Sequence, residues 1–143
     1  MPNYFGCWKN GFLKVNGVDL SDHVREMNLE ISVAELPADT HSDTATKVVA
    51  GLENWQFTVN FLQDFAAGKV DATLRGSGLG TAGHSPFPIE CAADAGASIS
   101  STNPRYSGLV ILSAYKPFGG PHGGNLESAC TFKCAGNLAR QTS

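Results

Sequence analysis

The chain has 143 residues, a length that fits one domain with a core of its own. Charged residues make up only 16% of the chain, and the formal net charge is −3. The ten Lys and Arg residues are spread singly along the sequence, which disfavours a protein that binds nucleic acid tightly. No apolar run reaches the length of a membrane-spanning helix and the first residues lack a signal-peptide pattern, so we expect a protein made in the cytoplasm, with no membrane partner.

The first predicted elements are two short antiparallel segments. Residues 12–15 have strand composition, and the Asn16-Gly17 pair after them is the strongest short signal for a hairpin turn. A longer strand follows over 24–33, in which Met27, Leu29, Ile31 and Val33 alternate with polar residues. One face of this strand is therefore expected to be buried and the other wet.

Residues 34–48 then change character and become polar and irregular. Pro37 disfavours a central strand, and a connection of about fifteen residues is long for a compact domain. Loops of this length usually have a function or no fixed structure, so we expect a functional loop at about 34–50.

The most regular pattern begins at Glu53. Large apolar residues alternate with polar ones, which predicts a strand with one buried face. The apolar set is Trp55, Phe57, Val59 and Phe61, and the polar set is Gln56, Thr58 and Asn60. An α-helix is predicted after it, capped by Asp64 and ended by Gly76.

Three further strands are predicted in the second half of the chain. Residues 87–91 form one whose prolines would keep them at a sheet edge or at the start of a strand. Residues 106–115 form an apolar strand covered on both faces, and 126–134 form the last. The sum is a mainly β protein, a β-sandwich or barrel with one flanking α-helix, in a single domain spanning 1–143 with an N-terminal arm at 1–10.

No pattern of catalytic, metal or cofactor residues stands out. Residues 78–83 match the dinucleotide fingerprint G-x-G-x-x-G, but the strand before it and the helix after it are missing. Asp39, His41 and Asp43 alternate in the irregular loop without further ligands nearby. Cys130 and Cys134 would lie about 13 Å apart on one strand, beyond disulfide or zinc reach, so free cysteines are expected.

Four blocks in order resemble the major tail tube protein of long-tailed (siphovirus-like) bacteriophages. They are LKVNGVDLSDHV at 13–24, AGLENW at 50–55 followed by QDF at 63–65, TNPRYSG at 102–108, and the closing strand. The resemblance covers most of the chain and implies a tail-tube-like fold: a β-sandwich or barrel with a helix beside it.

This resemblance also implies a function. Members of the family form hexameric rings that stack into a hollow tube, and the genome passes through the lumen during ejection without specific binding. The implied partners are further copies of the chain, the tape-measure protein, the tail terminator and the tail-tip proteins, and the implied location is the virion tail. The loop at about 34–50 is expected to reach the adjacent ring, through Leu36, Pro37, Asp39, Thr40, His41, Asp43, Thr44 and Lys47.

We further hypothesise that one polar strand face lines the lumen, because an acidic, polar wall repels phosphates. The expected lumen residues are Glu26, Asn28, Glu30, Gln56, Thr58 and Asn60. An ordinary solvated outer face is the competing interpretation. Alternatives for the whole chain are another ring-forming tail component, such as a tail terminator or secretion-tube-like protein, or a small β-sandwich module that binds a ligand such as carbohydrate.

Overall fold

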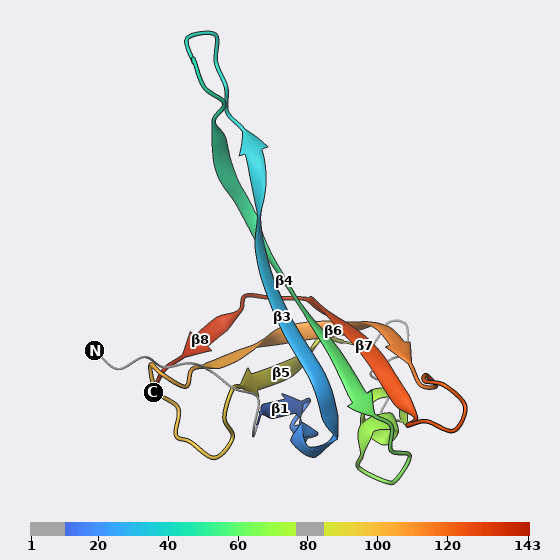
Figure 1. Cartoon of the computed structure of the whole chain (residues 1–143). Coiled ribbons are helices and arrows are strands. Elements are labelled where there is room, and N and C mark those ends of the chain that lie inside the picture. Colours follow the sequence, from blue (N-terminus) through green and yellow to red (C-terminus); the bar gives the residue numbers. More distant parts are fainter. Residues whose placement is uncertain (1–10, 77–84) are drawn as a thin grey trace.

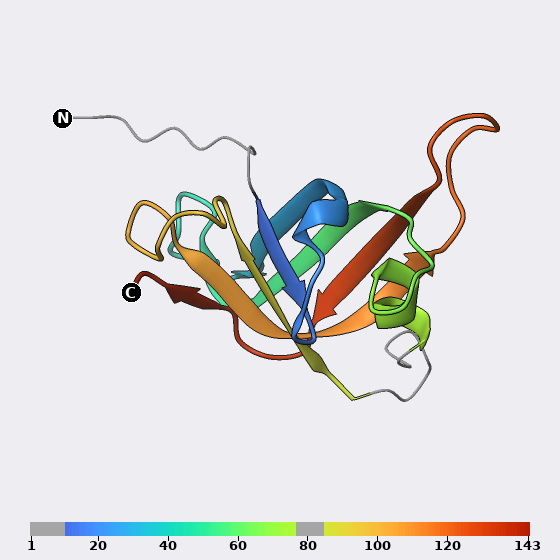
Figure 2. The ribbon, with the colours of Figure 1, turned by 90° about the horizontal axis from the view of Figure 1, so that it is seen from below.

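The computed structural model describes residues 11–76 and 85–143. Within them the chain is mainly β, as predicted: one antiparallel sheet curls around a single core, with very little helix (Figures 1 and 2). The strands are β1 (Phe12–Val15), β2 (Val18–Asp19), β3 (Val24–Pro37), β4 (Val48–Leu62), β5 (Phe87–Ala92), β6 (Arg105–Lys116), β7 (Glu127–Cys134) and β8 (Ala139–Gln141). Their order across the sheet is β2-β1-β5-β6-β7-β4-β3, with β8 also paired to β6.

The first hairpin forms as the sequence predicts. Asn16 and Gly17 both have positive φ, 48° and 83°, which is the backbone that a two-residue hairpin turn requires. A 3₁₀ turn, η1 (Ser21–His23), then leads into β3. The hairpin therefore places β1 against β5 on the opposite side of the core from β4.

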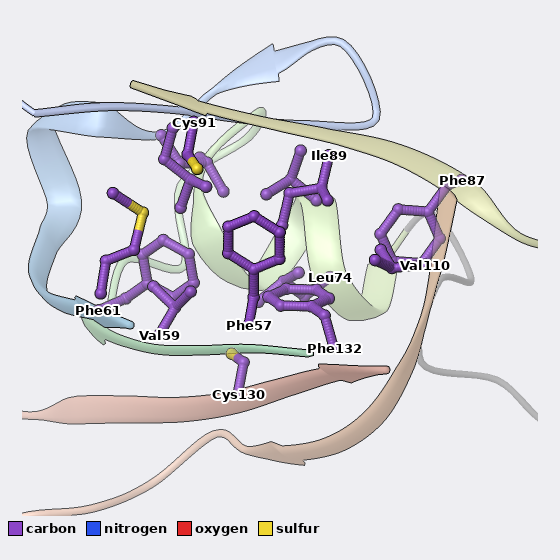
Figure 3. Close-up of a cluster of buried hydrophobic side chains, with 14 of the residues drawn as sticks. Phe57, Val59, Phe61, Leu74, Phe87, Ile89, Cys91, Val110, Cys130 and Phe132 are labelled. Atoms are coloured by element: carbon purple, nitrogen blue, oxygen red, sulfur yellow. The ribbon is translucent and has the colours of Figure 1, made fainter. Parts of the chain in front are cut away.

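The core is built on the alternating face of β4, also as predicted. Trp55, Phe57, Val59 and Phe61 are at most 2% exposed. Figure 3 shows Phe57 pointing from β4 toward Ile89 on β5, so the curled sheet packs its own two halves together. Burying such aromatic and aliphatic side chains contributes about 1.5–3 kcal/mol each before entropy is counted.

A close approach between β4 and β6 depends on a glycine. The indole nitrogen Nε1 of Trp55 donates to the carbonyl oxygen of Gly136 at 3.0 Å. A Cβ at Gly108 of β6 would lie only 2.7 Å from two atoms of the same indole ring. Glycine at 108 therefore gives the large ring its space.

The expected loop at about 34–50 is shorter than predicted, because the strands on both sides continue into it. Glu35, Leu36 and Pro37 pair with Ala50, Val49 and Val48, which leaves only residues 38–47 as the connection. The register shifts between residues 33 and 35, where a bulge interrupts the ladder, and this hid the alternation. Pro37 is tolerated because β3 is an edge strand.

The predicted α-helix is replaced by a turn and one short π-helical segment, η2 (Ala72–Gly76). Asp64 does cap a turn, since its Oδ1 accepts from the Ala66 amide at 2.9 Å, but Gly68 has φ 73° and breaks the helical path. Val70 and Leu74 of this segment are fully buried and pack on the core.

The second half of the chain differs from the prediction at β6 and β8. β5 is an inner strand, and Pro88 lies at its start, one of the two positions predicted for its prolines. The Pro88 carbonyl accepts from the Asn16 backbone amide at 2.8 Å, beyond the last β1–β5 pair, so the N–H that proline lacks breaks no pair of the ladder. β6 is covered on one face only, since Leu109 and Ile111 are 46% and 42% exposed. β8 was not predicted, because three residues carry too little periodic signal.

Candidate assembly surfaces

The β3–β4 hairpin projects from the body as a long arm (Figure 1). We define the arm as residues 30–54; its strand residues 30–37 and 48–54 are exposed on both faces, with only Gly51 half-buried. Large apolar side chains are among them: Ile31, Val33, Leu36, Val48, Val49 and Leu52, with exposed fractions of 46–87%. A two-stranded hairpin is marginal by itself in water, and clustered exposed apolar surface marks an interface.

The tip of the arm, residues 38–47, is tied by its own hydrogen bonds. The Ala38 amide donates to the Lys47 carbonyl at 3.0 Å, and the Thr40 amide donates to Asp43 Oδ2 at 2.7 Å. Lys47 Nζ lies 2.7 Å from Asp43 Oδ1, and these hydrogen bonds, that from Lys47 foremost, lower the pKa of Asp43. The tip therefore has a defined shape without help from the body.

The eight residues expected to contact an adjacent ring all lie on this arm. Leu36 and Pro37 are in β3, and the other six are in the tip. Asp39 accepts from the Lys47 amide, and Asp43 is occupied by Thr40 and Lys47, so these carboxylates serve the turn. Among the described residues no group of three or more His, Cys, Asp or Glu side chains is placed to hold a metal ion.

The structure brings the six expected lumen residues together. They are direct cross-strand partners in three pairs, Glu26 with Asn60, Asn28 with Thr58, and Glu30 with Gln56. Since directly opposed residues share a face, the six form one polar patch on the outside of β3 and β4. Thr131 and Lys133 of β7 extend this patch, and Lys133 donates to Gln56.

The sheet does not close into a complete barrel. Its edge strands are β2 and β3, and a groove of about 700 Å³ lies beside them, lined among others by Asp19 of β2 and by Met27 and Asn28 of β3. An open strand edge is a template for pairing with another chain.

A second exposed apolar surface lies at the far end of β4 from the arm tip. We define this aromatic base as Leu62, Phe65, Phe118 and Leu126, which are 38%, 52%, 67% and 40% exposed. The Phe65 and Phe118 rings pack with centroids 5.8 Å apart. Sequence reasoning missed this surface, because Phe65 and Phe118 come from separate loops. Only the pairing of β4 with β7 brings the two loops together.

His23 links the two ends of the hairpin at its root. Its Nδ1 lies 2.7 Å from Asp22 and its Nε2 lies 2.9 Å from Asp64, which follows β4. Burial disfavours the charged imidazole, but the hydrogen bonds to Asp64 and Asp22 outweigh it, so the pKa of His23 is raised. The pKa of Asp64 is lowered in turn, first by the hydrogen bond from the Ala66 amide and then by the hydrogen bond from His23.

The remaining sequence candidates are three thiols and two segments outside the described residues. Cys91, Cys130 and Cys134 are free thiols, and burial raises the pKa of Cys91 and Cys130 to about 12. The glycine-rich motif at 78–83 and the N-terminal arm at 1–10 lie outside the described residues. No helix in the described part of the chain is long and apolar enough to cross a membrane.

Comparison with known proteins gives structural matches alone. No family model matches the chain, and no curated protein matches its sequence. A chain from the virion of a native gene transfer agent particle superposes with a TM-score of 0.70 at 10% identity, over 94% of this chain and 97% of the other. A chain from the tail of an empty gene transfer agent particle of C6 symmetry gives 0.64 at 12% identity, over 85% and 83%.

A third match comes from an extracellular contractile injection system, in a structure of its sheath/tube terminator. Its TM-score is 0.73 at 8% identity, and it covers 98% of this chain and 99% of the other. At such low identity these likenesses speak for the fold. The chain therefore has a tail-tube-like fold, shared over nearly its whole length with a chain of a gene transfer agent virion and a chain of a contractile injection system.

Proposed function

We propose that this chain is a structural subunit of a phage-like tail, and specifically the tail tube subunit, which forms hexameric rings stacked into a hollow conduit for the genome. The observation that carries the proposal is the arm, whose exposed apolar residues on a two-stranded hairpin need a partner to cover them. The tail-tube-like fold and the open strand edges of the sheet support the same reading.

In this proposal each exposed feature has a place in the assembly. The sheet edges at β2 and β3 meet neighbours within a ring, and the arm with its eight expected contact residues reaches the next ring. The tape-measure, terminator and tail-tip proteins would be the partners inside and at the ends of the tube. The site of action would be the virion tail.

Electron microscopy of the purified protein, with sizing chromatography alongside, tests this function. Rings and hollow tubes of uniform width are the expected result. A monomer that never associates, even at high concentration, would count against it and would favour a small binding module.

A tube terminator is the second candidate, because one of the structural matches comes from a sheath/tube terminator complex. A terminator closes a tube, so it should form single rings that do not stack. The two candidates therefore separate in the same micrographs: tubes that lengthen with concentration support the tube subunit, and rings that stay single support the terminator.

We also propose that the polar patch of Glu26, Asn28, Glu30, Gln56, Thr58 and Asn60 faces the lumen. Replacing Glu26 and Glu30 by Lys should make assembled tubes retain short DNA duplexes, with binding that weakens steeply as salt rises. The matched control replaces the same two residues by Gln, which removes the negative charge without adding a positive one. Equal DNA retention by the Lys and Gln variants would refute the lumen assignment.

A further inference from the structure

Two exposed apolar surfaces lie at opposite ends of β4. The arm carries one at the start of the strand, and the aromatic base of Leu62, Phe65, Phe118 and Leu126 carries the other at its end. β4 has 15 residues, which corresponds to about 50 Å of extended chain. The arm of one copy therefore cannot fold back onto its own base; Figure 1 shows the arm tip and the end of β4 on opposite sides of the molecule.

The charge of the chain is divided in a complementary way. The arm holds five carboxylates and one lysine, a formal charge of −4, whereas the whole chain carries −3, so all other residues together carry +1. An arm is thus repelled by another arm and weakly attracted to the body of another copy. This favours head-to-tail contact over the pairing of two arms.

We propose that the aromatic base is the surface that receives the arm of a second copy of this chain, in the next ring. The inference rests on the proposed function and deepens it by naming the receiving surface. Because the arm and the base are different patches, the contact is heterologous, and its repetition gives an open stack instead of a closed pair.

The base is held in shape before any partner arrives. The backbone N–H of Gln63 donates to the Leu126 carbonyl at 2.9 Å, and the backbone N–H of Glu127 donates to the Gly119 carbonyl at 3.0 Å. These bonds fix the loops that carry Phe65 and Phe118, so the loops lose little conformational entropy when a partner docks. Aromatic side chains, Phe included, are also enriched at protein–protein interfaces relative to the rest of the surface.

The experiment uses two variants of the full chain and one control. The base variant carries Phe65→Ser and Phe118→Ser, and the arm variant carries Val49→Ser and Leu52→Ser. All four side chains are at least half exposed, so both variants should unfold at the same urea concentration as the wild type. The control, Leu109→Ser, removes an apolar side chain of 46% exposure from the outer face of β6.

The base variant should need at least about tenfold more protein than the wild type for half-maximal stacking, measured by light scattering and electron microscopy. The arm variant should show a similar defect, and the control should stack like the wild type. A mixture of base and arm variants should associate only into pairs of rings, because each pair retains one intact arm and one intact base. Such pairing supports the proposal strongly.

Three outcomes would overturn it. If the base variant stacks as well as the wild type, the arm docks elsewhere, although the tube function stands. If the mixture shows no more association than its separate components, or if the control fails like the base variant, the arm does not select this base. If the wild type never associates, the proposed function falls, and this inference falls with it.

Discussion

Replacing Gly108 by Ala should destabilise the protein, because the new methyl group would enter the space of a buried ring. The Cβ would lie 2.7 Å from two carbons of the Trp55 indole and 3.1 Å from the Asn137 carbonyl oxygen. Trp55 is 2% exposed and its nitrogen is bonded to the Gly136 carbonyl, so the ring cannot move aside without losing packing or that hydrogen bond.

The expected size follows from opposing terms. Overpacking costs about 1–3 kcal/mol, and loss of the indole hydrogen bond would add about 1 kcal/mol. A glycine-to-alanine change also lowers the conformational entropy of the unfolded chain, which stabilises the folded state by about 0.4–1 kcal/mol. The net loss in the free energy of unfolding of Gly108→Ala is therefore about 1–3 kcal/mol, measured by urea denaturation with tryptophan fluorescence and circular dichroism.

Gly136→Ala is the matched control, since its Cβ would lie at an ordinary 3.6 Å from Leu109. This variant should be as stable as the wild type or slightly more stable. Trp55→Phe should remove most of the penalty, so that Gly108→Ala costs little in that background. If Gly108→Ala is as stable as Gly136→Ala, the reasoning from the close approach is refuted.

Three more predictions concern titratable side chains. The pKa of His23 is raised, so the stability that its hydrogen bonds contribute is complete below the ordinary value of 6.5 and is lost as pH rises through the higher folded value. His23→Gln or Asp64→Asn should therefore flatten the pH dependence of the unfolding midpoint. An unchanged slope in these variants would contradict this role of His23. Cys91 and Cys130 should resist maleimide in the native protein and react after unfolding, as followed by mass spectrometry, whereas fast native labelling would show that they are not buried. Tyr115→Phe should cost about 0.5–1.5 kcal/mol in urea denaturation, because its hydroxyl donates to a carboxylate at 2.8 Å; a neutral result would mean that this bond adds nothing net.

The local sequence pattern was sufficient for the elements whose signal is local. The Asn16-Gly17 turn needs only two residues with positive φ, and the alternation from Trp55 to Phe61 is long and strong enough to predict both the strand and its buried face. The same alternation identified the polar residues that pair across β3 and β4, because in antiparallel strands opposed residues share a face.

The tertiary structure decided what covers each strand. Met27 and Ile31 have the same place in the alternation, yet Met27 is 8% exposed and Ile31 is 47% exposed, because β3 runs past the end of the body. Periodicity says which side of a strand a residue takes, whereas burial depends on neighbours distant in the chain. For the same reason the aromatic base, made by Phe65 and Phe118 from two loops, has no signature in the sequence and exists only once β4 and β7 are paired.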